Sequence, residues 1–121
     1  MKKIIRLATA GLILFNLSFI PAAVNASERL KVCAEYKNSG KKYFVDATYL
    51  TGKELNQATK SRKYTYYSNY VVIFWDQGQA SIIELDSLSS LAGISYFGSD
   101  GHDQQGYPWE VTKVSHSIYC W

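Results

Sequence analysis

Titratable side chains gather in one stretch of the chain, Gly98–Gly106, which contains Asp100, His102 and Asp103. Imidazole and carboxylate groups both bind divalent ions, so these three side chains are candidate metal ligands. Three ligands so close together need a fourth from elsewhere, which His116 would have to supply. The stretch also lacks the alternating oxygen donors of an EF-hand loop. We therefore interpret it as a solvated polar loop and predict no bound metal.

Covalent and acid–base catalysis have few candidate residues here. The chain has two histidines, and no serine lies in the Gly-x-Ser-x-Gly pattern of a nucleophile elbow. The carboxylate pairs Asp100/Asp103 and Asp76/Glu84 could flank a glycosidic bond, but nothing else in the sequence marks them. We predict a protein that is not an enzyme and binds no cofactor. A small metal-dependent hydrolase built on the loop at residues 100–103 is an alternative.

Aromatic and basic residues gather in Lys60–Tyr67, which reads Lys-Ser-Arg-Lys-Tyr-Thr-Tyr-Tyr. Tyrosine and tryptophan combine a large apolar area with a polar group and are enriched at recognition surfaces. A polar turn, Asp76–Gln79, follows the next apolar run. We predict that this stretch and this turn insert together into the cleft of a protein partner. The predicted binding residues are Ser61, Arg62, Lys63, Tyr64, Tyr66, Tyr67, Trp75, Asp76 and Gln77.

The elements that must position these residues begin with two apolar runs, Tyr70–Trp75 and Ala80–Leu85. Their β-branched and aromatic residues suit strands, and Gly78 between them supplies the positive φ of a tight turn. We predict a β-hairpin at the centre of a small sheet. One buried helix is the alternative, because short apolar runs do not separate strand from helix by period alone.

Alternating apolar residues predict two earlier strands, Arg29–Tyr36 and Lys42–Leu50, which form a first hairpin. Thr51 and Glu54 match a capping box, so a short helix over Gly52–Thr59 is expected, with a loop as the alternative.

The C-terminal part is predicted to contain a short strand at Leu91–Phe97, a polar loop at Gly98–Gly106 and a closing strand at Trp109–Trp121. Short strands in such number within one small domain are typical of closed or curled sheets. We predict an all-β fold, a small antiparallel barrel or curled sheet of about six to eight strands with at most one short helix.

The N-terminal segment has the parts of a secretory signal peptide. It begins with Lys2, Lys3 and Arg6, continues with apolar residues to about position 20, and ends in small residues before Ser27. The apolar run is shorter than the roughly 20 residues that span a bilayer. We predict cleavage after Ala26, which leaves residues 27–121 as one β domain, periplasmic or secreted.

Two cysteines, Cys33 and Cys120, lie near the ends of that domain. An even number of cysteines in an exported protein indicates a disulfide, here expected to join the first and last strands. A reactive thiol pair is the alternative, but the close Cys-x-x-Cys spacing is missing. The bond would restrict the unfolded chain by about 4–5 kcal/mol in the entropy model.

Charge is balanced in the domain but unevenly distributed. Three of the thirteen basic residues lie in the signal segment, which leaves ten of each sign and makes nucleic acid an improbable partner. Residues 27–63 are rich in Lys and Arg, whereas residues 64–121 contain Lys113 as their one basic side chain. We expect ion pairs between neighbouring strands to link the two halves, with a polarised surface as the alternative.

One segment resembles the bacterial periplasmic inhibitors of c-type lysozyme. Their Phe-Trp-x-Lys-Gly-x-x-Ala hairpin is similar to residues 74–81, and their Ser-Gly-x-x-Tyr loop is loosely similar to residues 61–64. The resemblance implies a small exported barrel of eight strands with a disulfide near both ends, and a loop serine and a hairpin lysine that enter the lysozyme cleft. The serine corresponds to Ser61 or Thr59, and the lysine position is occupied by the uncharged Gln77. The loop glycine is missing, and the spacing to Tyr64 differs by one residue.

These observations predict an exported, non-enzymatic binding protein that blocks a partner's cleft with residues 60–67 and 76–79, as an inhibitor or protective protein would. Its partner is expected to be a protein in the periplasm or outside the cell, with no nucleic acid and no membrane span after signal cleavage. A structural or envelope-associated component without an enzyme target is the alternative.

Overall fold

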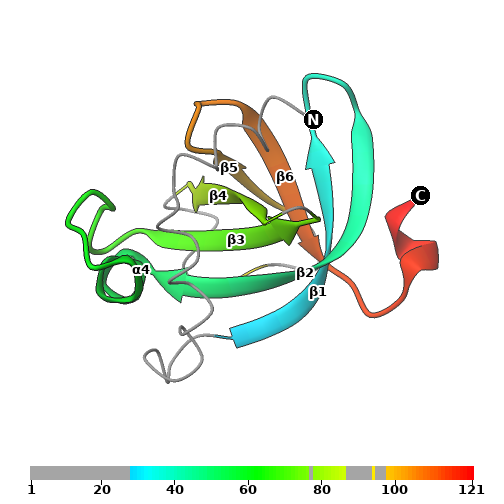
Figure 1. The fold of residues 1–121 in the computed structure, drawn as a ribbon. Helices are drawn as coiled ribbons and strands as arrows, with labels where there is room; N and C mark the ends of the chain where they lie inside the picture. Colours follow the sequence, from blue (N-terminus) through cyan, green and yellow to red (C-terminus); the bar gives the residue numbers. More distant parts are fainter. Residues whose placement is uncertain (1–27, 77, 87–93, 95–97) are drawn as a thin grey trace.

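Strands β1 to β6 pair in sequence order and close into an antiparallel barrel, because β6 also pairs with β1 (Figure 1). The computed structural model describes residues 28–76, 78–86, 94 and 98–121. The expected signal peptide, its cleavage site and Gln77 lie outside this part. The all-β barrel prediction is confirmed. The strands are β1 Glu28–Tyr36, β2 Lys41–Thr51, β3 Asn69–Trp75, β4 Gln79–Leu85, β5 Ser99–His102 and β6 Pro108–Lys113.

The barrel interior is filled by the inward-facing residues of alternating strand positions. Val32, Val71, Ile73 and Trp109 are completely buried there, and other members of the cluster complete the core around them. Alternation follows from the strand pleat, which sends successive side chains to opposite faces. The predicted central hairpin is confirmed, with Trp75 opposite Gln79 in the register of β3 and β4.

The outer face of β2, β3 and β4 is also buried, because helix α4 (Gly52–Thr59) covers it. Leu55 of α4 packs with Leu50, Tyr70 and Val72 in a second apolar cluster. Strands buried on both faces lose the apolar–polar alternation, which explains the near-continuous apolar run in β3. The protein therefore has two apolar cores, one inside the barrel and one between the sheet and α4.

Helix α4 begins where the capping box predicted it. The Thr51 hydroxyl accepts from the Glu54 amide at 3.2 Å, and a Glu54 carboxylate oxygen accepts from the Thr51 amide at 2.8 Å. These two bonds satisfy donors that the first turn of a helix leaves unpaired. The expected short helix is confirmed over the same residues.

The polar loop predicted at 98–106 contains a strand, β5. Its inward residues are Ser99 and Gly101, both buried, while Asp100 and His102 face outward. A Cβ on Gly101 would lie too close to the Glu84 carbonyl of β4, so this position requires glycine. Apolar alternation could not reveal a strand whose inward side chains are this small. The predicted strand at 91–97 lies outside the described residues except for Ile94, which packs in the barrel interior.

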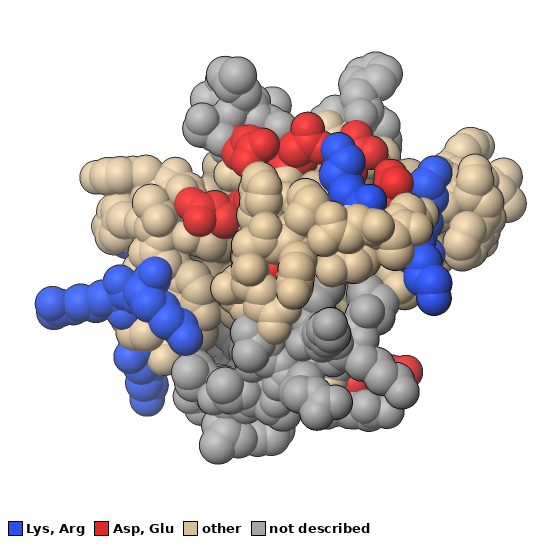
Figure 2. Space-filling model, turned by 90° about the horizontal axis from the view of Figure 1, so that it is seen from above, with Lys and Arg blue, Asp and Glu red and all other residues tan. Residues whose placement is uncertain are grey.

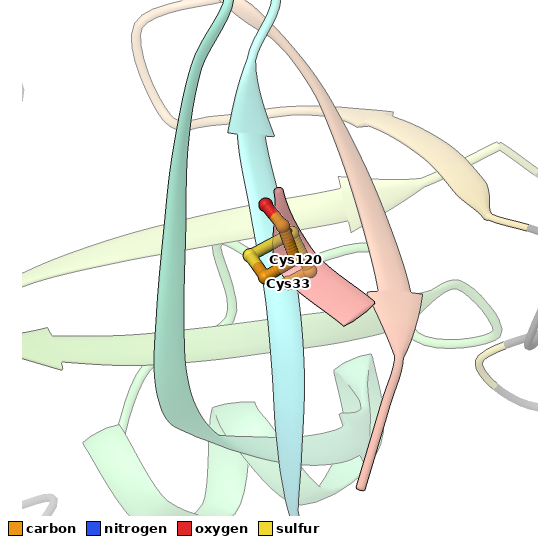
Figure 3. The surroundings of a disulfide bond; sticks show 2 residues. All are labelled: Cys33 and Cys120. Atoms are coloured by element: carbon orange, nitrogen blue, oxygen red, sulfur yellow. A yellow bond between two sulfur atoms is a disulfide. The ribbon is translucent and has the colours of Figure 1, made fainter. Parts of the chain in front are cut away.

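The closing strand is shorter than predicted and ends at Lys113, and a 3-10 helix, η2 (Ser117–Cys120), follows it. The disulfide between Cys33 and Cys120 is present, with the Cα atoms 5.2 Å apart (Figure 3). It joins β1 to η2 and not to the last strand. The reason is the strand pleat: Val32 and Ala34 point inward, so Cys33 points outward and can meet only a segment that crosses the outer face.

Asp103 is a buried carboxylate that holds the turn between β5 and β6. One oxygen accepts from the backbone amides of Gln105 and Tyr107 at 2.9 and 3.0 Å. The other accepts from the indole of Trp109 at 2.9 Å. The side chain is thus fully used in fixing the turn to the core.

Strands β4 and β5 share only two paired positions, at Glu84 and Leu85. Beyond them the side chain of Gln104 takes the place of a strand residue. Its oxygen accepts from the Ile82 amide at 2.9 Å, and its nitrogen donates to the Ala80 carbonyl at 3.0 Å. A side-chain amide therefore completes the barrel at its shortest seam.

Candidate binding site

A cleft opens between helix α4 and the segment 60–66 that follows it. Its volume is about 610 Å³, and its lining joins predicted and unpredicted residues. Four of the predicted binding residues meet there: Ser61, Arg62, Tyr64 and Tyr66. The helix and its C-cap contribute Lys53, Asn56, Gln57 and Lys60.

Hydrogen bonds fix the position of segment 60–66 relative to the helix and the barrel. Lys60 ends the helix in the left-handed conformation, with φ of 54°. The Asn56 side chain then donates to the Tyr64 carbonyl and accepts from the Tyr64 amide, both at 3.0 Å. The Thr65 amide donates to the Tyr70 hydroxyl at 2.8 Å. Both walls of the cleft are therefore fixed to the barrel before any partner arrives.

The end of the segment returns to the start of the helix at Gly52. The Gly52 amide donates to the Ser68 carbonyl at 2.8 Å, and the Lys53 amide donates to the Tyr66 carbonyl at 3.1 Å. A Cβ on Gly52 would overlap the carbonyl oxygen of Thr65. The local sequence shows Gly52 as a helix residue only, so its role in this close approach could not be predicted.

Four exposed cations surround the cleft: Lys53, Lys60, Arg62 and Lys63. All ten acidic residues of the chain lie in the part that the structure describes, and none of them forms an ion pair with these four cations. The nearest acid in sequence, Glu54, is engaged in the helix cap. Figure 2 shows a group of basic side chains at the end of the molecule that carries α4, and a band of acidic side chains, with other basic ones beside it, along another edge of the same face.

Two of these cations lie over tyrosine rings. The Lys53 ammonium is 5.9 Å from the ring centre of Tyr66, and the Lys63 ammonium is 5.5 Å from that of Tyr64. Contacts of this kind hold a flexible lysine near one position, each by about 0.5–1 kcal/mol at an exposed site. Positive charge is therefore placed along the rim by the aromatic residues.

Burial raises the pKa of Tyr64 to about 12, and the neighbouring Tyr70 adds to the rise. Below the ordinary tyrosine value of 10 the side chain is neutral in both folded and unfolded chains. Between pH 10 and about 12 the Tyr64 hydroxyl ionises in the unfolded chain but not in the folded one. The free energy of unfolding therefore falls as pH rises. We expect Tyr64→Phe to reduce this fall, measured by urea unfolding from about pH 9 to about pH 11. Tyr67→Phe, which changes a highly exposed ring, is the control. Its free energy of unfolding should decrease with pH as much as that of the wild type. Equal slopes for all three proteins would contradict the assignment.

The other predicted residues lie elsewhere. Tyr67 is 89% exposed and packs edge-on against Tyr66 outside the cleft lining. Trp75 is part of the interior, where its indole donates to the Ser81 hydroxyl at 2.9 Å and its ring meets Tyr43. Asp76 follows β3 directly, and Gln77 lies outside the described residues.

The segment and the turn lie at opposite ends of β3 (Figure 1). A strand of seven residues spans about 20 Å. The structure therefore does not bring the turn at 76–79 to the cleft, and the two cannot form one compact site. This separation could have been predicted from the sequence, because the loop precedes the strand at 70–75 and the turn follows it.

The three side chains considered as metal ligands have other partners in the structure. Asp100 pairs with Lys37 at 3.4 Å, His102 lies 3.9 Å from Asp86, and Asp103 is engaged in its turn. Across residues 28–76, 78–86, 94 and 98–121, no three His, Cys, Asp or Glu side chains are placed to hold an ion.

Charge is more polarised than we expected. Two ion pairs do link the halves, Lys37 with Asp100 and Lys113 with Glu28, but the four side chains are 34–57% exposed, and such pairs are weak. Acidic residues also face each other across strands: Glu110 lies opposite both Glu35 and Asp100. We expected ion pairs between strands to neutralise the excess of basic residues in the first half of the domain. For the cations around the cleft this expectation is wrong.

Comparison with models of protein families, with curated proteins and with solved structures gives no match for this chain. Its class therefore rests on fold and site: a disulfide-linked antiparallel barrel with a basic, tyrosine-lined cleft beside its one described α-helix. No helix among the described residues is long and apolar enough to cross a membrane.

Proposed function

We propose that this chain is an exported, non-enzymatic binding protein that engages a protein partner through the cleft between α4 and residues 60–66. The observation that carries the proposal is the fixed geometry of the cleft. Asn56, Tyr70 and Gly52 hold its outer wall in place, so little conformational entropy is lost on binding. Tyr66, which is 47% exposed, provides an aromatic contact at the rim.

Export and the location outside the cytoplasm are part of the proposal. The disulfide supports them, because such bonds persist in oxidising compartments. An inhibitor or protective role follows from the same reasoning as the binding: a rigid projecting wall can occupy a groove on a partner. The turn at 76–79 is too far from the cleft to share that contact, so we assign the contact to the cleft side alone.

A photo-crosslinking residue placed at Tyr66 in the exported protein tests this function. We expect one discrete protein adduct from position 66, and its loss when Arg62→Glu is added. The same crosslinker at Lys41, an exposed position at the start of β2, is the control and should give no such adduct. Adducts of equal pattern from both positions, or none from position 66, would contradict the proposal.

Inhibition of c-type lysozyme is the specific form of the hypothesis. The oxidised domain, titrated into a lysozyme assay, should inhibit stoichiometrically if that enzyme is the partner. Arg62→Glu should then abolish inhibition, while Asp76→Ala at the far end of β3 should retain it. The reverse pattern would place the inhibitory contact on the turn.

A structural or envelope-associated component is the second candidate, and a specific observation favours it. Helix η2 and the C-terminal residue expose Ile118, Tyr119 and Trp121, each more than 60% accessible, on a segment anchored by the disulfide. Sedimentation of the oxidised domain at increasing concentration distinguishes the two. A monomer at all concentrations argues against self-assembly through this segment.

A further inference from the structure

We infer that the ligand of the cleft is an acidic, carboxylate-bearing segment of a protein; this rests on the proposed function and gives its partner a chemical class. The first support is the absence of internal counter-ions. Lys53, Lys60 and Arg62 line the cleft and form no ion pair with any acid in the described chain, which includes all ten. Unpaired cations around a concave surface produce a positive field that attracts carboxylates.

Two carbonyls at the C-terminal end of α4 are paired within its own cap. The C-terminus of a helix carries partial negative charge on its last carbonyls. Here the Asn56 carbonyl accepts from the amides of Lys60 and Ser61, and the Gln57 carbonyl also accepts from the Lys60 amide. With these carbonyls paired, the lysine and arginine charges dominate the cleft.

The chemistry of the lining separates a peptide from an anionic polysaccharide. Sugar rings are commonly bound by bare aromatic faces and by free side-chain amides that read hydroxyl groups. In this cleft Lys53 and Lys63 lie over the rings of Tyr66 and Tyr64. The Asn56 side-chain amide donates one bond to the backbone of Tyr64 and accepts another from it, which leaves its second N–H and the exposed Gln57 side chain as the amide groups of the lining. All the charged side chains of the lining are cations, Lys53, Lys60 and Arg62, and this set matches the carboxylates of an acidic ligand.

Arg62 adds a geometric requirement to this recognition. A guanidinium presents two parallel N–H donors to one carboxylate, whereas ammonium groups act as point charges. Arg62 lies on the segment wall and Lys53 on the helix wall. A short acidic segment lying between the walls can therefore meet cations on both sides.

Fluorescence anisotropy with labelled hexaglutamate and hexaglutamine tests the inference on the oxidised domain. We expect hexaglutamate to bind and hexaglutamine not to bind. The affinity for hexaglutamate should fall at least about tenfold between about 50 mM and about 500 mM salt, since the contacts are exposed and screened.

Two variants of equal charge change localise the site. Lys53→Glu with Arg62→Glu should weaken hexaglutamate binding at least about tenfold, and both positions are exposed, so the fold is retained. Glutamate at position 53 also suits the first turn of a helix. Lys41→Glu with Lys42→Glu lies at the other end of β2, which is eleven residues long, a path of about 33 Å along the strand. This control pair should bind within about twofold of wild type.

Three results would overturn the inference: no hexaglutamate binding, equal weakening in both double variants, or binding of heparin without binding of hexaglutamate. The last would make the ligand a polysaccharide. Failure of the inference is separable from failure of the proposed function. A position-66 protein adduct without hexaglutamate binding leaves the function and rejects the ligand class, whereas loss of both rejects both.

Discussion

Replacing both Cys33 and Cys120 by serine is expected to lower the free energy of unfolding by about 4 kcal/mol. The two residues are 87 positions apart, so the bond closes nearly the whole domain into one loop and restricts the unfolded chain. A small domain has a modest apolar core, and this constraint is a large part of its net stability. Urea unfolding of the variant against the oxidised wild type measures the difference.

The reduced wild type is the matched control for that experiment. Its free energy of unfolding should be close to that of the double-serine variant, because both proteins lack the disulfide and keep the same barrel residues. A variant as stable as the oxidised protein would show that the native barrel does not depend on the bond. The exposed η2 segment should lose its protease resistance in both forms, since Cys120 is its only fully buried residue.

Gly52→Ala is expected to destabilise the domain by about 2 kcal/mol or more, although alanine is the better helix former. The added Cβ would overlap the carbonyl oxygen of Thr65, and backbone cannot move as easily as a flexible side chain. To relieve the overlap, segment 60–66 must leave the helix and break the bond from the Gly52 amide to Ser68. We therefore expect loss of hexaglutamate binding together with loss of stability.

Ser115→Ala is the control for this prediction. It changes one small, uncharged side chain at an exposed position outside the cleft, and should leave both stability, within about 0.5 kcal/mol, and hexaglutamate binding unchanged. Thermal unfolding and anisotropy on the same samples check both effects. A stable Gly52→Ala protein with intact binding would mean that the segment tolerates a shift at Thr65 and that the cleft walls are less fixed than the contacts indicate.

Local signals in the sequence identified the elements that depend on neighbouring residues. The capping box of Thr51 and Glu54 set the start of α4, and Gly78 with its flanking apolar runs set the β3–β4 hairpin. Both depend on interactions within a few residues, which sequence patterns record directly. The pairing of Cys33 with Cys120 was also predictable, because only two cysteines exist.

The missed elements depend on contacts distant in sequence. β5 is buried through Ser99 and Gly101, whose small size matters only because β4 lies so close. The end of β6 at Lys113 reflects the return of η2 across the outer face toward Cys33. Neither property alters the local pattern of apolar residues, so a reading of periodicity does not detect it.

The candidate site was predicted in part for the same reason. The composition of residues 60–67 marks a recognition surface wherever it folds. The helix wall, with Lys53 and Asn56, belongs to the site only because α4 packs beside the segment. The turn at 76–79 was joined to the site because the basic, tyrosine-rich stretch lies directly before the central hairpin, and the length of β3 separates the two.

The Gln104 side chain, which stands in for a strand residue beside β4, has a consequence for how the barrel opens. Backbone strands separate cooperatively, whereas one side-chain amide can rotate away alone. The Ile82 amide should therefore exchange its hydrogen with solvent by a small local fluctuation, sooner than the amides shared between β3 and β4. An opening that widens from this point would leave β5, β6, β1, β2, β3 and β4 as one continuous open sheet, still tied by its disulfide. Opening of the barrel can therefore begin at Gln104, but it is complete only when the backbone pairs at Glu84 and Leu85 also break and the interior core is exposed.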